Sequence, residues 1–160
     1  MKYIFEKIIS WFGFQVCNFT VALTITSLIF FCPAGASAAE NPNDILIVVN
    51  NKVAVSAVSI GEVRDIFLKN KTHWSASQKA LPINSKDSAL RDDFRSRVLK
   101  MNSAAEERHW RDAKVRDNKT EPASFGDSLK AVFKLPGAIG YVYRKDYNSS
   151  AAKVVLVIPK

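Results

Sequence analysis

The sequence predicts an α/β fold in which a mixed sheet is flanked by helices, giving three layers. Two observations carry this prediction. Apolar runs of strand length alternate along the chain with segments whose apolar residues recur every three or four positions. Short polar stretches that hold Asn, Ser, Pro or Gly separate these segments. Alternation of this kind is typical of a sheet whose strands are connected by helices.

Four apolar segments are expected to form the main strands. They are Ile45–Val49, 80–84, 138–143 and 154–158. The first is a continuous run of Ile, Leu and Val, which indicates a strand buried on both of its faces. Val53, Val55 and Ala57 alternate with smaller or polar residues, so we expect one further short extended segment there.

Two serine–glutamate pairs predict the starts of helices. Ser59 lies three residues before Glu62, the spacing of a capping box in which each side chain satisfies a free backbone N–H. We therefore expect a helix over 60–68, with a buried face formed by Ile60, Val63, Ile66 and Phe67. Ser103 and Glu106 repeat the capping-box spacing and predict a shorter helix that carries Trp110.

Two more helices are expected from apolar spacing. The first covers 89–100, and its buried face would hold Leu90, Phe94, Val98 and Met101. Ser124 is expected to cap the second, which would bury Phe125, Leu129, Val132 and Phe133 and end at Pro136-Gly137. The charged stretch 112–123 lacks apolar periodicity, so we expect an exposed loop there.

The first 38 residues have the composition of an export signal. Lys2 and Lys7 precede the stretch 8–39, which contains no Asp, Glu, Lys or Arg. The small residues Ala36-Ser37-Ala38 have the spacing that signal peptidase recognises. We expect cleavage after Ala38, leaving a domain of residues 39–160 in the periplasm or secreted. The alternative is an uncleaved anchor, because the apolar stretch is long enough to span a bilayer.

Cysteine content and net charge reduce the range of functions that the sequence allows. Cys17 and Cys32 both lie in the leader, so its removal leaves no thiol for a disulfide, a metal site or a nucleophile. The formal net charge is +8, and without the leader's two lysines and Glu6 it is +7. A positive charge favours anionic partners, although it also serves solubility alone. Export makes nucleic acid the least expected of these partners.

The sequence contains none of the common catalytic motifs. It lacks the G-x-S-x-G elbow, the phosphate-binding G-x-x-x-x-G-K-[ST] loop, the G-x-G-x-x-G turn and the H-E-x-x-H zinc motif. Glu106 and His109 have the spacing found in di-iron bundles, but such sites need a second pair and two more carboxylates. We therefore expect neither an enzyme nor a bound metal or other cofactor.

One segment has a physical basis for binding a ligand. Residues 85–88 connect an expected strand to an expected helix, where free backbone N–H groups and the helix dipole suit an oxyanion. Ser88 offers a hydroxyl, while Lys86 and Arg91 offer positive charge. The candidate anion-binding residues are Ser85, Lys86, Asp87, Ser88, Ala89, Leu90 and Arg91. The alternative is an ordinary helix cap with solvated basic neighbours.

The order of these segments resembles a known family. The helix reads S-I-G-E-V-R-D-I-F over 59–67 and precedes Trp74, and P-G-A-I-G-Y-V covers 136–142. Between them, a strand with Pro82-Ile83 leads into Asp87-Ser88. From about Ile45 to Val142 the chain resembles the phosphate-binding periplasmic component of ABC transporters, a type 2 periplasmic binding protein. The resemblance implies a transport-related, non-catalytic binding module for phosphate or another small oxyanion.

The chain also departs from that family. Members with a complete site have two lobes, and this chain resembles one of them. Their phosphate loop reads R-S-D-G-S-G-T, and its second Ser matches Ser88, its last Gly matches Ala89 and its Thr matches Leu90. The position of its Arg falls on Asn84. The resemblance therefore implies weak binding, unless two chains pair as a homodimer.

A second function remains open. The chain would keep the lobe fold without binding a solute and act as an envelope protein–protein interaction or signalling module. The lost ligands and the positive charge favour this alternative, and the charged stretch 112–123 would be its contact surface. Contact with a membrane is expected only through the leader, if it stays uncleaved.

Overall fold

The computed structural model describes residues 40–150 and 152–160. The expected leader and its cleavage site lie outside the described residues. These described residues form a compact unit with its own core. Within the described ranges, no helix has the length and hydropathy needed to cross a membrane.

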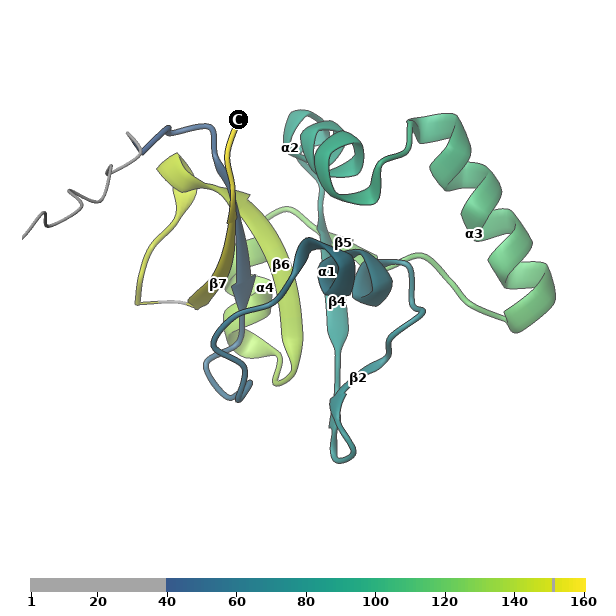
Figure 1. Ribbon diagram of the computed structural model, residues 1–160, viewed down its shortest axis with the longest axis horizontal. Coiled ribbons are helices and arrows are strands. Elements are labelled where there is room, and N and C mark those ends of the chain that lie inside the picture. The colour runs from purple at the N-terminus through teal and green to yellow at the C-terminus, as the bar shows by residue number, and fades with distance from the viewer. Residues whose placement is uncertain (1–39, 151) are drawn as a thin grey trace, which may run out of the picture. The chain divides into compact units, whose positions relative to one another are not determined.

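A five-stranded mixed sheet lies at the centre of this unit (Figure 1). Its strands are β1 (Ile45–Val49), β4 (Leu81–Ser85), β5 (Ala123–Phe125), β6 (Ala138–Tyr143) and β7 (Lys153–Ile158). They lie in the order β5-β4-β6-β1-β7. Strand β4 is parallel to β5 and β6, whereas β1 is antiparallel to β6 and β7. A separate hairpin pairs β2 (His73–Ser75) with β3 (Gln78–Lys79).

Helices cover both faces of the sheet and produce the expected three layers (Figure 1). On one face lie α1 (Ile60–Phe67), α2 (Ser88–Phe94) with its π-helical continuation η1 (Arg95–Leu99), and α3 (Ser103–Asp117). The other face carries α4 (Ser128–Lys134), and a short 3₁₀ turn, η2 (Arg144–Asp146), follows β6. Strand β1 contributes alternate residues to the two core clusters, which explains why it is apolar throughout.

Three aromatic rings join the helices to the sheet. Phe94 of α2 stacks on Tyr141 of β6, with ring centroids 3.9 Å apart and an interplanar angle of 1°. Phe67 of α1 lies 4.7 Å from the Phe94 ring and 5.6 Å from the Tyr141 ring. All three side chains are buried, so α1 and α2 are held against the same strand.

The first predicted helix is confirmed, and two details near it are wrong. Ser59 accepts a hydrogen bond from the Glu62 N–H, and the Glu62 carboxylate accepts one from the Ser59 N–H, as the capping box requires. Ile60, however, is 41% exposed, because as the first helical residue it lies at the edge of the buried face. The stretch 53–57 forms a loop after β1 rather than a short strand, although Val53 is buried.

The third helix begins and ends differently from the prediction. Its N-cap is Asn102, whose side chain accepts from the Ala105 N–H at 2.8 Å, so Ser103 is the first helical residue. The helix continues to Asp117, through the first half of the stretch 112–123 that was expected to be a loop. Few of its side chains reach the core, among them Trp110 and Ala113, and a helix with so narrow a buried face shows little apolar periodicity.

The start of the fourth helix is also shifted. Ser124 lies in β5, where it is paired with Asn84 of β4, and the helix is capped instead by Asp127. Val132 is buried as expected, but Phe125 and Phe133 are 38% and 54% exposed. Residues 123–125 adopt an extended conformation because their main chain pairs with β4. Local sequence preferences do not reveal this pairing.

Gly137, in the segment P-G-A-I-G-Y-V, has a backbone conformation that requires glycine. Its φ of +84° lies in the left-handed region, and a Cβ atom there would overlap the backbone carbonyl oxygen of Lys79. The Trp74 Nε1–H donates to the Gly137 carbonyl oxygen at 2.8 Å. Gly137 and Trp74 therefore hold the β2–β3 hairpin against the turn that precedes β6.

We predict that Gly137→Ala destabilises the fold by about 2 kcal/mol, from the positive φ together with the clash at Lys79. Gly126→Ala is the matched control, because nothing lies within 4 Å of its added Cβ. Urea unfolding of residues 37–160 measures both variants. Equal midpoints for the two variants would contradict the role given to Gly137.

Candidate functional site

The candidate segment lies where the parallel strands end. Ser85 is the last residue of β4 and Ser88 is the first of α2, and β4 runs parallel to its neighbours β5 and β6. In open α/β sheets, ligands bind outside the carboxyl ends of such strands. The fold therefore places the predicted anion-binding segment at the edge where a ligand is expected.

The seven candidate residues differ in how accessible they are. Ser85 and Leu90 are buried, and Leu90 belongs to the hydrophobic core. The exposed members are Lys86, Asp87, Ser88 and Ala89. Arg91 is partly buried, with 26% of its side chain exposed. A solute can thus reach the four exposed residues and Arg91, but not the side chains of the other two.

Asp87 accepts hydrogen bonds from backbone N–H groups that we expected to be free for a ligand. Its Oδ1 accepts hydrogen bonds from the backbone N–H groups of Ala89 and Leu90, at 3.0 and 3.4 Å. The carboxylate therefore acts as the N-cap of α2 and places negative charge at the helix start. An incoming anion has to compete with this side chain.

Arg91 belongs to a network of charged side chains. Its Nη2 pairs with Glu121 and lies 3.5 Å from Glu106 Oε2. Glu106 also accepts from Arg95 Nε at 2.6 Å, and Arg95 pairs in turn with Asp92. The network connects α2, η1, α3 and the segment that precedes β5.

The central pair of this network is largely excluded from water. The side chains of Arg95 and Glu106 are only 11% and 8% exposed. Burial lowers the pKa of the Arg95 guanidinium, but the hydrogen bonds and charges of Glu106 and Asp92 outweigh this effect and raise its pKa above the ordinary value. Arg95 therefore stays charged at neutral pH.

A cavity of about 470 Å³ opens beside Ser88. Its walls include Arg91 and Arg95, so two arginines line the same cavity as the predicted serine. The same walls carry four carboxylates, those of Asp92, Glu106, Glu107 and Glu121. The negative charges outnumber the guanidinium groups, so the net charge of the cavity lining disfavours a free anion.

Asn84, at the position of the family's loop arginine, serves a structural role here. It is buried, its Nδ2 donates to Glu121 at 3.3 Å, and its Oδ1 accepts from the Tyr141 hydroxyl at 3.4 Å. The same hydroxyl accepts from the Ser85 N–H at 3.3 Å. Burial raises the pKa of Tyr141 to about 12, so the hydroxyl keeps the proton that it donates to Asn84.

Sequence reasoning missed several of these residues. Tyr141 was assigned to a buried strand, which is correct, but no sequence signal shows that its hydroxyl reaches the loop after β4. Glu121 is 30 residues from Arg91 in the chain, so only the fold brings the two together. Glu106 was assigned to a capping box and instead pairs with two arginines.

The arrangement around Glu106 and His109 gives no indication of a metal site. Within residues 40–150 and 152–160, no three His, Cys, Asp or Glu side chains are grouped closely enough to hold a metal ion. The Glu106 carboxylate is engaged by Arg91 and Arg95.

No protein-family model matches the chain, and no curated protein matches it. The solved structures with a similar fold include the following three. One is an ABC-type phosphate transport receptor from Vibrio cholerae, with a TM-score of 0.53 and 15% identity over 69% of this chain and 44% of that one. A putative phosphate ABC transporter substrate-binding protein with bound phosphate, from Clostridium perfringens, has a TM-score of 0.52 and 17% identity over 69% and 43%. PstS from Borrelia burgdorferi has a TM-score of 0.53 and 13% identity over 69% and 46%.

These likenesses confirm the fold that the sequence resemblance implied. The chain has a mixed α/β architecture similar to one lobe of the phosphate-binding proteins of ABC transporters. It spans less than half the length of each of the three structures. At such low identity the likeness concerns the fold alone.

We predict that Glu106→Gln destabilises the domain by about 3 kcal/mol, because it leaves the buried charge of Arg95 without its carboxylate. Glu107→Gln is the matched control, since Glu107 is the exposed neighbour on the same helix, and it should change stability by less than about 0.5 kcal/mol. Thermal and urea unfolding of the two variants test this. A Glu106→Gln protein as stable as the control would mean that the ion pair contributes nothing.

Proposed function

We propose that the chain is a non-catalytic binding module that binds phosphate or another small oxyanion weakly at the start of α2. The observation that carries this proposal is the meeting of Ser88, Arg91 and Arg95 in one cavity at the carboxyl edge of the parallel strands. The fold likeness to phosphate transport receptors supports it. Ser88 would donate its hydroxyl to the anion and Arg91 would supply charge.

Three features make the proposed binding weak. Asp87 competes for the N–H groups at the helix start, and Glu121 competes for Arg91. A single lobe also provides no second wall that closes over the ion and excludes water. We expect a Kd of about 0.1–1 mM, which corresponds to roughly −5 to −4 kcal/mol.

The pairing of Glu121 with Arg91 suggests how a ligand enters. Both a carboxylate and a phosphate present oxygens that the guanidinium can bind. In the proposed complex, phosphate displaces the Glu121 carboxylate from Arg91, and Glu121 remains partly solvated. Removing the charge of Glu121 should therefore strengthen binding, in contrast to most substitutions of a binding-site residue.

We predict that isothermal titration of residues 37–160 with phosphate shows binding that is about tenfold weaker in Ser88→Ala, since a hydrogen bond to a charged group is lost. Glu121→Gln should bind about fivefold more tightly, because a competing charge is removed. Ser77→Ala, in an exposed part of the hairpin connection, should match the unchanged protein.

Two outcomes of this titration would contradict the proposal. One is the absence of heat up to millimolar phosphate in the unchanged protein and in Glu121→Gln. The other is binding that Ser88→Ala leaves unaltered.

We further propose that the protein is exported and that its leader is removed after Ala38. The small residues before that position and the likeness to substrate-binding proteins of transporters support this. The first residue of the purified protein distinguishes the alternatives: Ala39 is expected, and Met1 would indicate an uncleaved anchor.

A partner-docking lobe is the second candidate function. It is favoured by the carboxylates of Asp87 and Glu121, which already occupy groups that a solute would need. A lobe of this kind would act in the envelope through its surface. The first half of the stretch 112–123 proposed as its contact lies in α3, and the second half leads into β5.

A further inference from the structure

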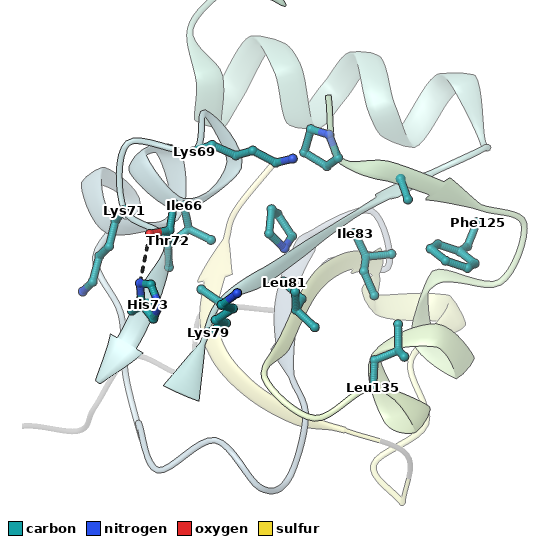
Figure 2. A pocket seen from close by; sticks show the side chains of 14 residues that line it. Ile66, Lys69, Lys71, Thr72, His73, Lys79, Leu81, Ile83, Phe125 and Leu135 are labelled. Atoms are coloured by element: carbon teal, nitrogen blue, oxygen red, sulfur yellow. Dashed lines mark hydrogen bonds between the residues drawn. The ribbon is translucent and has the colours of Figure 1, made fainter. Parts of the chain in front are cut away.

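A groove beside the first residues of β4 differs in chemical character from the cavity beside Ser88. It encloses about 500 Å³ between the end of α1, the β2–β3 hairpin, the edge strand β5 and the end of α4. Figure 2 shows Leu81, Ile83, Phe125 and Leu135 toward one end of it and Lys69, Lys71, His73 and Lys79 toward the other. Leu81, Phe125 and Leu135 are 40%, 38% and 38% exposed, so the apolar part is open to solvent.

The groove continues beyond its apolar end. A second cavity, of about 430 Å³, shares Phe125 and Leu135 with the first and adds Ala131 of α4. Lys130 and Lys134 line this second part. The continuous groove therefore has an apolar centre with lysines at both ends.

The lysines of the groove are largely uncompensated. Lys71 pairs with Glu62, but within residues 40–150 and 152–160 the ion pairs include none of Lys69, Lys79, Lys130 and Lys134. Asp127 is the acidic residue among the lining side chains. Its carboxylate accepts a hydrogen bond from the Lys130 N–H and so caps α4. By contrast, the arginines of the cavity beside Ser88 are paired with carboxylates.

We propose that this groove binds an acidic peptide segment of a partner protein, with apolar side chains over Leu81, Phe125 and Leu135 and acidic residues toward the lysines at each end. Charge complementarity selects an acidic segment over a basic or neutral one. A peptide fits better than a small solute, because two adjoining cavities form one elongated site.

The edge strand gives a further reason for an extended peptide. Strand β5 is the outermost strand of the sheet and pairs with β4 on one side only. Among residues 40–150 and 152–160 no strand pairs with its outer side, so the main-chain groups there can pair with an added strand, as in other complexes in which a peptide extends a sheet. The concave shape and this free edge favour a chain segment over a flat anionic bilayer.

A labelled model peptide, Asp-Glu-Leu-Val-Phe-Leu-Glu-Asp, tests the proposal by fluorescence anisotropy with residues 37–160. We expect a Kd of about 10–100 µM at low salt, weakened at high salt. The double variant Lys79→Glu/Lys134→Glu removes a lysine at each end and should weaken binding at least about tenfold. The double variant Phe125→Ser/Leu135→Ser should weaken peptide binding to a similar extent, because it removes apolar contacts at the centre of the groove.

Matched controls keep the test specific. Lys114→Glu changes an exposed lysine of α3, and Phe133→Ser changes an exposed aromatic residue of α4, and neither residue lines the groove. Both should bind like the unchanged protein, and urea unfolding checks that every variant is folded. A peptide with Lys in place of its acidic residues should not bind.

Several results would overturn the proposal. These are no saturable binding of the acidic peptide, equal binding of the basic peptide, or equal loss in the control variants. Binding to vesicles of phosphatidylglycerol that the groove variants abolish, without peptide binding, would assign the groove to a membrane surface instead. Ser88→Ala should leave peptide binding unchanged, so this inference stands or falls independently of the proposed anion site.

Discussion

The position of the candidate site depends on the stack between Tyr141 and Phe94. Tyr141 lies in β6, and its ring holds the body of α2 through Phe94. Its hydroxyl accepts from the Ser85 N–H and donates to Asn84, at the loop where α2 begins. One buried side chain thus fixes both the helix and the chain that leads into it. The cavity beside Ser88 has its shape because these two elements are fixed together.

The second constraint is that partly buried arginines need anionic partners. In this lobe Arg91 and Arg95 obtain them from Glu106 and Glu121 of the same chain. The groups that suit an oxyanion are therefore present but already neutralised. The groove beside β5 shows the reverse condition, with lysines that have little internal compensation. The two surfaces differ in how much unbalanced charge they offer a partner.

Much of the fold could be predicted because burial leaves a strong pattern in the sequence. Strand β1 is apolar throughout since both of its faces contact core clusters, and the Ser59–Glu62 capping box acts within four residues. The end of α3, residues 112–117, could not be predicted, because few side chains of this helix contact the core. Strand β5 could not be predicted either, since three residues become a strand only by pairing with β4.

The candidate site was predictable only in part. The place of Ser88 at a helix start follows from local sequence, and the structure places it there. The influence of Glu121 on Arg91 depends on tertiary structure, because the two residues are far apart in the chain. The use of Asp87 as the cap is local, but Asp and Ser are both good caps, so sequence alone did not decide which side chain would take the helix N–H groups.

The central claim is that a single lobe keeps an anion site at the start of α2. The most direct test is a ¹H–¹⁵N NMR titration of residues 37–160 with phosphate, followed to about 10 mM because a Kd of about 0.1–1 mM is expected. Saturable shifts of the Ser88, Ala89 and Arg91 amides, with those of Leu81 and Phe125 unchanged, are the predicted result. Saturable shifts confined to the groove around Leu81 and Phe125, or no saturable shift anywhere, would contradict the claim.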